Sequence, residues 1–154
     1  MRRGGEKKWD GAGGQADQAL GRSRGGFGTK VHMSCDGLGH PVELLLTGAQ
    51  ESDIAQAEAL LADHRPEEVI ADRGYDKKAL VEEIESCGAR AVIPTQRGRK
   101  VQRQVDRHAY RERNVCERFW SKAKQYRRVA TRYEKKAANY LAFVKVAAMM
   151  VMLQ

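Results

Sequence analysis

The stretch "EEVIADRGYDKKALVEEIESCGARAVIP", residues 67–94, contains two short apolar runs separated by a charged segment. The runs "EEVIA" and "ARAVIP" are typical of short buried strands. The segment between them, "DKKALVEEIESCG", has apolar residues at helical spacing and predicts a helix that Asp76 caps and Gly88 ends. A strand, a helix and a second strand in this order predict an α/β fold.

The residues before this stretch predict a β-hairpin and a helix. "TKVHMSC" and "PVELLLT", within residues 29–47, are typical of strands, and "DGLG" between them is typical of a turn that starts at Asp36. Residues 52–64 have apolar side chains at helical spacing, with Ser52 or Asp53 as the expected N-cap.

The residues after it predict a loop and two helices. Residues 95–106 are typical of an exposed basic loop, residues 107–128 of a long helix, and residues 134–154 of a last helix. Met149, Met150 and Met152 are expected to fill the core. The complete order predicts a mixed sheet flanked by helices.

Residues 1–26 differ in composition from the rest of the chain. They hold eight of the fifteen glycines and many charges, with almost no apolar periodicity. This predicts a flexible Gly-rich basic arm, followed by a single domain over residues 27–154. A chain of 154 residues with 42% hydrophobic content supports one modest core.

The charge is large and unevenly distributed. The formal net charge is +8, which favours a polyanionic partner, either nucleic acid or an acidic membrane surface. Residues 97–136 hold fifteen Lys and Arg against four Asp and Glu, a net of +11, whereas residues 31–96 hold five against thirteen, a net of −8. An acidic centre therefore precedes a basic region.

The cysteines and the apolar segments indicate a cytoplasmic protein. Cys35, Cys87 and Cys116 are odd in number and far apart, so neither a disulfide framework nor a zinc site is expected. The N-terminal residues lack the apolar region of a signal peptide, and no run reaches the roughly 20 apolar residues that cross a membrane. We expect no membrane partner.

Within the basic region, "YRERNVCERFWSKAK", residues 110–124, surrounds Glu117 with basic and aromatic side chains. On a helix that turns about 100° per residue, Tyr110, Arg113, Glu117 and Lys124 lie within roughly a 60° sector. The opposite side carries residues that can be buried: Val115, Phe119, Ala123 and Tyr126. The alternative is that Glu117 forms only surface ion pairs.

A second carboxylate is expected at the edge of the sheet. Asp72 follows the run "EEVIA", where open α/β sheets place their ligands. If the long helix packs across that edge, Asp72 and Glu117 approach each other, and two close carboxylates need a cation between them. Hard oxygen ligands select Mg²⁺ or Mn²⁺. The alternative is that Asp72 is only a turn residue.

Together these features resemble a known family. Bacterial insertion-sequence transposases of the DDE type have the signature Y(2)R(3)E(6)K, in which the numbers are the residues between the named ones. This sequence matches it with Tyr110, Arg113, Glu117 and Lys124. The stretches "LGRSRGGFGTKVH", "DIAQAEALL", "ADRGYD" and "ATRYEKKAANYLAF" look like those of the insertion-sequence-five group, so the resemblance extends from about residue 17 to the end.

The resemblance implies an RNase H-like fold and Mg²⁺-dependent (or Mn²⁺-dependent) cleavage and joining of DNA ends. Asp72 and Glu117 would be the second and third catalytic, metal-binding acids, and Tyr110, Arg113 and Lys124 would bind transposon-end DNA. Arg97, Arg99 and Lys100 in the basic loop are further candidates for contacts with DNA phosphates. The location implied is the bacterial cytoplasm, associated with the nucleoid.

The resemblance also implies that one part is missing. The family's first acid lies on the first, central strand, upstream of the Gly-rich arm, and this chain begins after that point. We therefore expect an inactive C-terminal fragment that needs the upstream transposase fragment or a full-length transposase as partner. The alternative is a non-catalytic DNA-binding fragment that modulates the full-length transposase.

Overall fold

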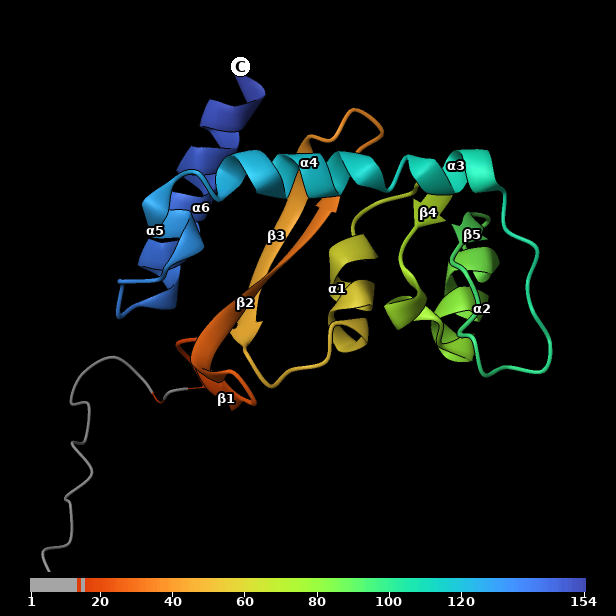
Figure 1. Ribbon diagram of the computed structural model, residues 1–154, viewed down its shortest axis with the longest axis horizontal. Helices are drawn as coiled ribbons and strands as arrows, with labels where there is room; N and C mark the ends of the chain where they lie inside the picture. Colours follow the sequence, from red (N-terminus) through yellow and green to blue (C-terminus); the bar gives the residue numbers. More distant parts are fainter. Residues whose placement is uncertain (1–13, 15) are drawn as a thin grey trace, which may run out of the picture.

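The computed structural model describes residues 14 and 16–154 (Figure 1). Its first unit is the predicted hairpin, in which β2 (Gly26–Cys35) pairs antiparallel with β3 (Pro41–Gly48). In the turn, the Asp36 carboxylate accepts hydrogen bonds from the Leu38 and His40 amides, both at 2.9 Å. This confirms both the hairpin and the role of Asp36 in its turn.

A third strand precedes the hairpin. β1 (Gly21–Ser23) pairs antiparallel with the start of β2. Arg132 holds the preceding residues in place, because its Nη1 donates to the Gln18 carbonyl at 2.8 Å and to Thr29 Oγ1 at 2.5 Å. Ordered structure thus begins before the predicted boundary at Phe27. Residues 1–13 and 15 of the predicted flexible arm lie outside the described residues.

The second unit contains the strand, helix and strand from which the α/β fold was predicted. After η1 (Ile54–Gln56) and α1 (Ala57–Leu61) come β4 (Glu68–Ile70), η2 (Arg73–Tyr75), α2 (Lys78–Ser86) and β5 (Arg90–Val92). β4 and β5 pair in parallel. The mixture of α and β is confirmed, but the described strands form two separate sheets, β1-β2-β3 and β4-β5, instead of one.

The predicted cap of the first helix is not formed. Asp53 precedes η1, but its side chain makes no capping hydrogen bond, and the carboxylate instead pairs with Lys30 Nζ of β2 at 3.0 Å. Gly88 does end α2, as predicted, with a φ of +83°. This left-handed conformation is one that glycine adopts without strain.

The predicted long helix over residues 107–128 is divided into α3 (Arg107–Arg111), α4 (Asn114–Ala123) and α5 (Arg127–Ala130). Between α3 and α4 the backbone stays in the right-handed helical region and tightens, with the Arg113 amide bonded to the Tyr110 carbonyl at 3.3 Å. α3 and α4 consequently follow one another along nearly the same line (Figure 1). Tyr126, with extended backbone angles, separates α4 from α5.

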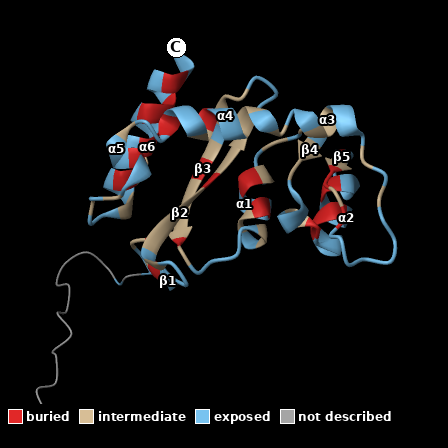
Figure 2. Ribbon diagram, in the orientation of Figure 1, coloured by how far each residue is buried: buried red, intermediate tan, exposed pale blue. Residues whose placement is uncertain are grey.

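The described residues form two apolar cores, one for each sheet (Figure 2). The first packs α4, α5 and α6 (Ala137–Met152) against the hairpin around Phe119, Tyr140 and Val144. The second packs α1 and α2 against β4 and β5 around Leu80, Ile84 and Ile93. α4 belongs to the first core, whereas α3 lies beside β4 and β5 (Figure 1).

Three methionines on the outer side of α6 are more exposed than predicted. Met149, Met150 and Met152 were expected in the core, but their side chains are 55%, 47% and 48% exposed. Apolar residues occur around most of α6, but only the side with Tyr140, Val144 and Val151 is buried in the first core. Within the described residues, no helix is long and apolar enough to span a bilayer.

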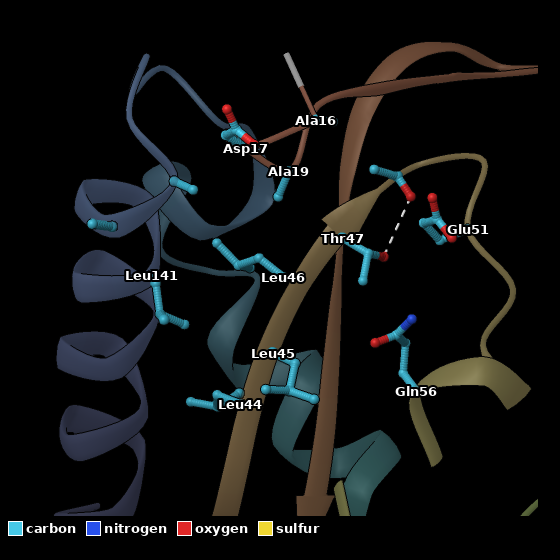
Figure 3. Close-up of a pocket in the computed structure, with 13 residues that line it drawn as sticks. Ala16, Asp17, Ala19, Leu44, Leu45, Leu46, Thr47, Glu51, Gln56 and Leu141 are labelled. Carbon is cyan, nitrogen blue, oxygen red and sulfur yellow. Dashed lines mark hydrogen bonds between the residues drawn. The ribbon is translucent and has the colours of Figure 1, made fainter. Parts of the chain in front are cut away.

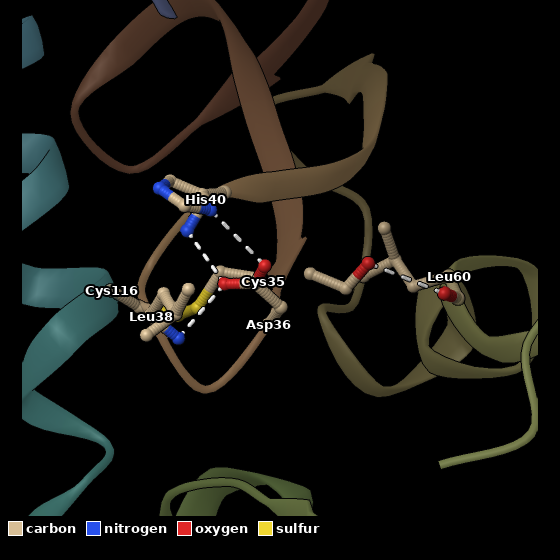
Figure 4. The surroundings of a disulfide bond; sticks show 7 residues. Cys35, Asp36, Leu38, His40, Leu60 and Cys116 are labelled. Carbon is tan, nitrogen blue, oxygen red and sulfur yellow. Dashed lines mark hydrogen bonds and ion pairs between the residues drawn. A yellow bond between two sulfur atoms is a disulfide. The ribbon is translucent and has the colours of Figure 1, made fainter. Parts of the chain in front are cut away.

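A disulfide joins Cys35 at the end of β2 to Cys116 in α4, with 6.4 Å between their Cα atoms (Figure 4). The prediction of unpaired cysteines was wrong for these two. The two cysteines are 81 positions apart in the sequence, so no local pattern indicated the bond, and only the packing of α4 on the hairpin brings them together. Cys87 is free and exposed.

Replacing both bonded cysteines, as in Cys35→Ser/Cys116→Ser, should lower the free energy of unfolding by about 2–4 kcal/mol, because the disulfide restricts the unfolded chain. Urea unfolding followed by circular dichroism measures this. Cys87→Ser is the control and should change stability by less than about 0.5 kcal/mol, as for an exposed side chain. Equal stability of the double variant and the parent would show that the disulfide does not contribute.

Candidate functional site

Asp72 lies at the carboxyl end of β4, at the edge of its sheet. Its backbone is extended, and its Oδ1 accepts a hydrogen bond from the Gly74 amide at 2.7 Å, which caps η2. A Cβ on residue 74 would lie only 2.8 Å from Oδ1, so the glycine allows this close approach. The turn therefore holds an exposed carboxylate at the edge where it was predicted.

Glu117 is exposed on α4 and has a cationic neighbour. Arg113 Nη1 pairs with Glu117 Oε1 at 2.6 Å, and the Arg113 guanidinium lies 5.6 Å from the centre of the Tyr110 ring. The tightened turn between α3 and α4 thus keeps three of the four signature residues in contact. Lys124 lies at the exposed C-terminal end of α4, and its participation stays a prediction.

Arg113 connects the two predicted carboxylates electrostatically. Partial burial alone would lower its pKa. The hydrogen bond to Glu117, the nearby Tyr110 and the negative charges of Glu117 and Asp72 outweigh this effect, so the pKa of Arg113 is raised above its ordinary value. Asp72, which follows β4, and Glu117, on the helix that packs on the hairpin, thus both contribute to the electrostatic surroundings of Arg113, Asp72 the less strongly. That the two carboxylates converge stays a prediction.

The predicted metal site requires carboxylate oxygens. Mg²⁺ is commonly held by one or two carboxylates, with water and substrate phosphates completing its coordination. Asp72 and Glu117 fit that role, since both are exposed oxygen donors. Among residues 14 and 16–154, no group of three or more His, Cys, Asp or Glu could hold a metal ion.

Asp76 has a different role from the predicted helix cap. Its side chain is fully buried, with Oδ2 paired to Arg99 Nε at 2.9 Å and Oδ1 to Arg103, and its Oδ2 also accepts from the Gln96 amide at 2.8 Å. Lys77, not Asp76, precedes α2. The sequence gave no sign of this, because the partners lie 20 to 27 residues further along the chain.

The predicted DNA-binding cations of the loop therefore differ in their surroundings. Arg99 is bound to Asp76, through both its carboxylate and, at 2.9 Å, its backbone carbonyl. Arg97 and Lys100 are exposed, and neither forms an ion pair with any residue that the structure describes. Asp76 thus fixes the course of the loop and leaves other cations available to a ligand.

A hollow elsewhere in the molecule does not belong to this site. It has a volume of about 400 Å³ and lies between β3, α6 and the residues before β1 (Figure 3). Leucine side chains from β3 and α6 line much of it, including Leu44, Leu46 and Leu141. None of the predicted site residues lines this hollow.

Comparisons with known proteins identify the family of this sequence. A family model described as "Transposase DDE domain" matches residues 1–153. The chain is 35% identical over 128 residues to a Brucella ovis protein named "Putative transposase for insertion sequence element IS6501", covering 82% of this chain and 98% of that protein. It is 30% identical over 136 residues to a Burkholderia cepacia protein named "Putative transposase for insertion sequence element IS402", covering 80% of this chain and 62% of that protein. No solved structure matches.

Asp76→Asn should lower the free energy of unfolding by about 2–3 kcal/mol, because it leaves Arg99 and Arg103 without their buried counter-charge. It should also speed tryptic cleavage within residues 96–105. Urea unfolding and limited proteolysis measure the two effects. Glu82→Gln, which removes an exposed ion pair with Lys78, is the control and should stay within about 0.5 kcal/mol of the parent.

Asp72→Asn and Glu117→Gln should each weaken Mn²⁺ binding at least about tenfold, since each removes a charged oxygen ligand. Arg113→Gln should strengthen it by a few-fold, because Arg113 is a competing cation at Glu117. Titration followed by electron paramagnetic resonance of free Mn²⁺ measures these affinities. Glu112→Gln, an exposed acid outside the proposed pair, should have no effect; a loss equal to that of Glu117→Gln would argue against the pair.

Proposed function

The chain belongs to the transposase DDE domain family, and from this premise we propose that it acts in DNA transposition as part of a DNA-cleaving and strand-transferring site. Asp72 and Glu117 would be its catalytic, metal-binding acids. The observation that supports this most directly is that Arg113, which pairs with Glu117 of α4 at 2.6 Å, is also under the electrostatic influence of Asp72, which precedes η2.

The proposed cofactor is Mg²⁺ or Mn²⁺, held by Asp72 and Glu117. A bound divalent ion would supply the Lewis acid that polarises a phosphodiester and lowers the pKa of an attacking water. Tyr110, Arg113 and Lys124 would hold the DNA next to the carboxylates. Arg97 and Lys100 would contact phosphates further along, while Arg99 would mainly order the loop through Asp76.

We propose an RNase H-like arrangement that a further strand completes. β2 pairs with β3 along Thr29–Cys35, whereas β1 pairs only with Gly26–Gly28 at its start. Along Thr29–Cys35 no described strand pairs with the other edge of β2 or joins it to β4. Such an edge presents unpaired backbone groups that favour addition of a strand. A strand inserted there from an upstream or full-length transposase chain would join the two sheets, and an acid on it would complete the set of three.

A second candidate function is supported by the charge of residues 97–136, which hold fifteen Lys and Arg against four Asp and Glu. In this alternative the chain is a non-catalytic DNA-binding fragment, which occupies element ends or enters assemblies of full-length transposase. Its basic region would still bind DNA through phosphate contacts, so the affinity would fall steeply as salt rises.

Cleavage assays distinguish the two functions. With Mg²⁺ and end DNA, the 154-residue chain alone should bind without cutting, whereas adding the polypeptide encoded immediately upstream in the same element should restore cleavage. Asp72→Asn and Glu117→Gln should abolish the restored cleavage and leave DNA binding in gel shifts intact. Binding without cleavage in every combination would favour the second function, and robust cleavage by the chain alone would contradict the need for a partner.

A further inference from the structure

A second hollow, near Asp72 in the fold, has no assigned role. It has a volume of about 830 Å³, and its lining comes from η2, the basic loop and α3. Arg73, which directly follows Asp72, lines it, and so does Tyr110 of the signature. The hollow therefore opens next to the site where DNA would be cut.

The lining of this hollow is strongly cationic. It contains four arginines, Arg73, Arg103, Arg107 and Arg111, and no acidic residue. Three of these, Arg73, Arg107 and Arg111, are exposed and form no ion pair with any described residue. Asp106, adjacent to Arg107, is directed elsewhere: its Oδ1 caps α3, and its Oδ2 lies 3.9 Å from Arg90.

Arg103 provides a second, independent observation. Its Nη2 pairs with the buried Asp76, and its backbone amide donates to Thr95 Oγ1 at 2.8 Å, so the residue is held in place before any ligand binds. Its Nη1 is buried and has no hydrogen-bond partner among the described residues. A buried donor without a partner is unfavourable unless an acceptor is supplied. A small shift of the Arg103 side chain would be needed to bring this donor to an anion in the hollow.

We propose that this arginine pocket binds phosphates of a single DNA strand and leads that strand to Asp72 and Glu117. Guanidinium groups pair with phosphate oxygens through two parallel hydrogen bonds, which suits an arginine lining without acids. The volume is that of a small-molecule site, large enough for a nucleotide or two but not for a duplex. The inference rests on the proposed function and names the strand-binding surface of the same site.

The test compares two double variants of the full chain that each remove two positive charges. Arg107→Gln/Arg111→Gln removes two exposed arginines of the pocket. Arg65→Gln/Lys145→Gln is the control, because both residues are exposed and lie outside the pocket. The probe is a fluorescein-labelled 12-nucleotide single strand, and anisotropy gives its affinity over a series of KCl concentrations.

The pocket variant should bind the single strand at least tenfold more weakly than the control. The slope of log K against log [KCl] should become less steep by about 1.4, the value for two lost phosphate contacts on a single strand. A 12-base-pair duplex should show no difference between the two variants. Equal binding of the single strand by both variants would contradict the proposal that the pocket binds DNA. If the pocket variant lost as much affinity for the duplex as for the single strand, the preference for a single strand would be contradicted.

Two further arms separate the possible failures. If the parent chain does not bind either DNA in 50 mM KCl, the proposed function itself fails, whereas normal parent binding with an unaffected pocket variant removes only this inference. Inorganic phosphate is added to the complex of the chain and the single strand, and KCl of equal ionic strength is the control. Phosphate should displace more of the strand than KCl does only when its concentration reaches the millimolar range. Displacement at micromolar concentration would identify free phosphate, and not DNA, as the ligand.

Discussion

The attachment of α4 to the hairpin is the constraint on which the candidate site depends. Phe119 and Ala123 are buried in the first core, and Cys116 is bonded to Cys35 of β2. Gly39, with a φ of +88°, lets the turn approach so closely that a Cβ there would lie 3.2 Å from the Val115 side chain. These contacts fix the rotation of α4 about its axis as well as its position. Glu117, one residue after Cys116, is thereby kept outside the first core, where Arg113 and Asp72 can reach it.

The two carboxylates are held by different parts of the fold. Glu117 depends on the first core, and Asp72 follows a strand of the second. No buried apolar cluster within the described residues joins the two; the contacts between them are polar, such as Lys30 with Asp53 and the Ser34 hydroxyl with the Leu60 carbonyl at 3.4 Å. Exposed polar contacts each contribute at most about 1 kcal/mol. The distance between Asp72 and Glu117 is therefore easier to change than either core, and a ligand that binds both acids can shift it.

Local patterns in the sequence were sufficient for the hairpin, for β4, α2 and β5, and for the contact of Tyr110, Arg113 and Glu117. Each of these depends on residues close together in the chain. What the sequence did not reveal depends on distant residues or on small changes of backbone angle. The disulfide and the partners of Asp76 join segments that meet only in the folded chain. The division of the long helix arises at residues 112–113, which keep helical backbone angles, so no breaker residue marks it. The exposed methionines of α6 show that apolar composition alone does not say which side of a helix is covered.

The acids of the basic region explain why a single glutamate lies among so many cations. Residues 97–136 contain four acids, and three of them have specific partners: Asp106 caps α3, Glu117 pairs with Arg113, and Glu134 pairs with Arg128. Asp76, from the preceding segment, forms ion pairs with Arg99 and Arg103. Four of the cations without a described acidic partner lie in the basic loop and α3, near Asp72: Arg97, Lys100, Arg107 and Arg111. These cations produce a positive potential near Asp72, which attracts a polyanion such as DNA. In the proposed function, the bound DNA would then lie close to the carboxylates that hold the metal ion.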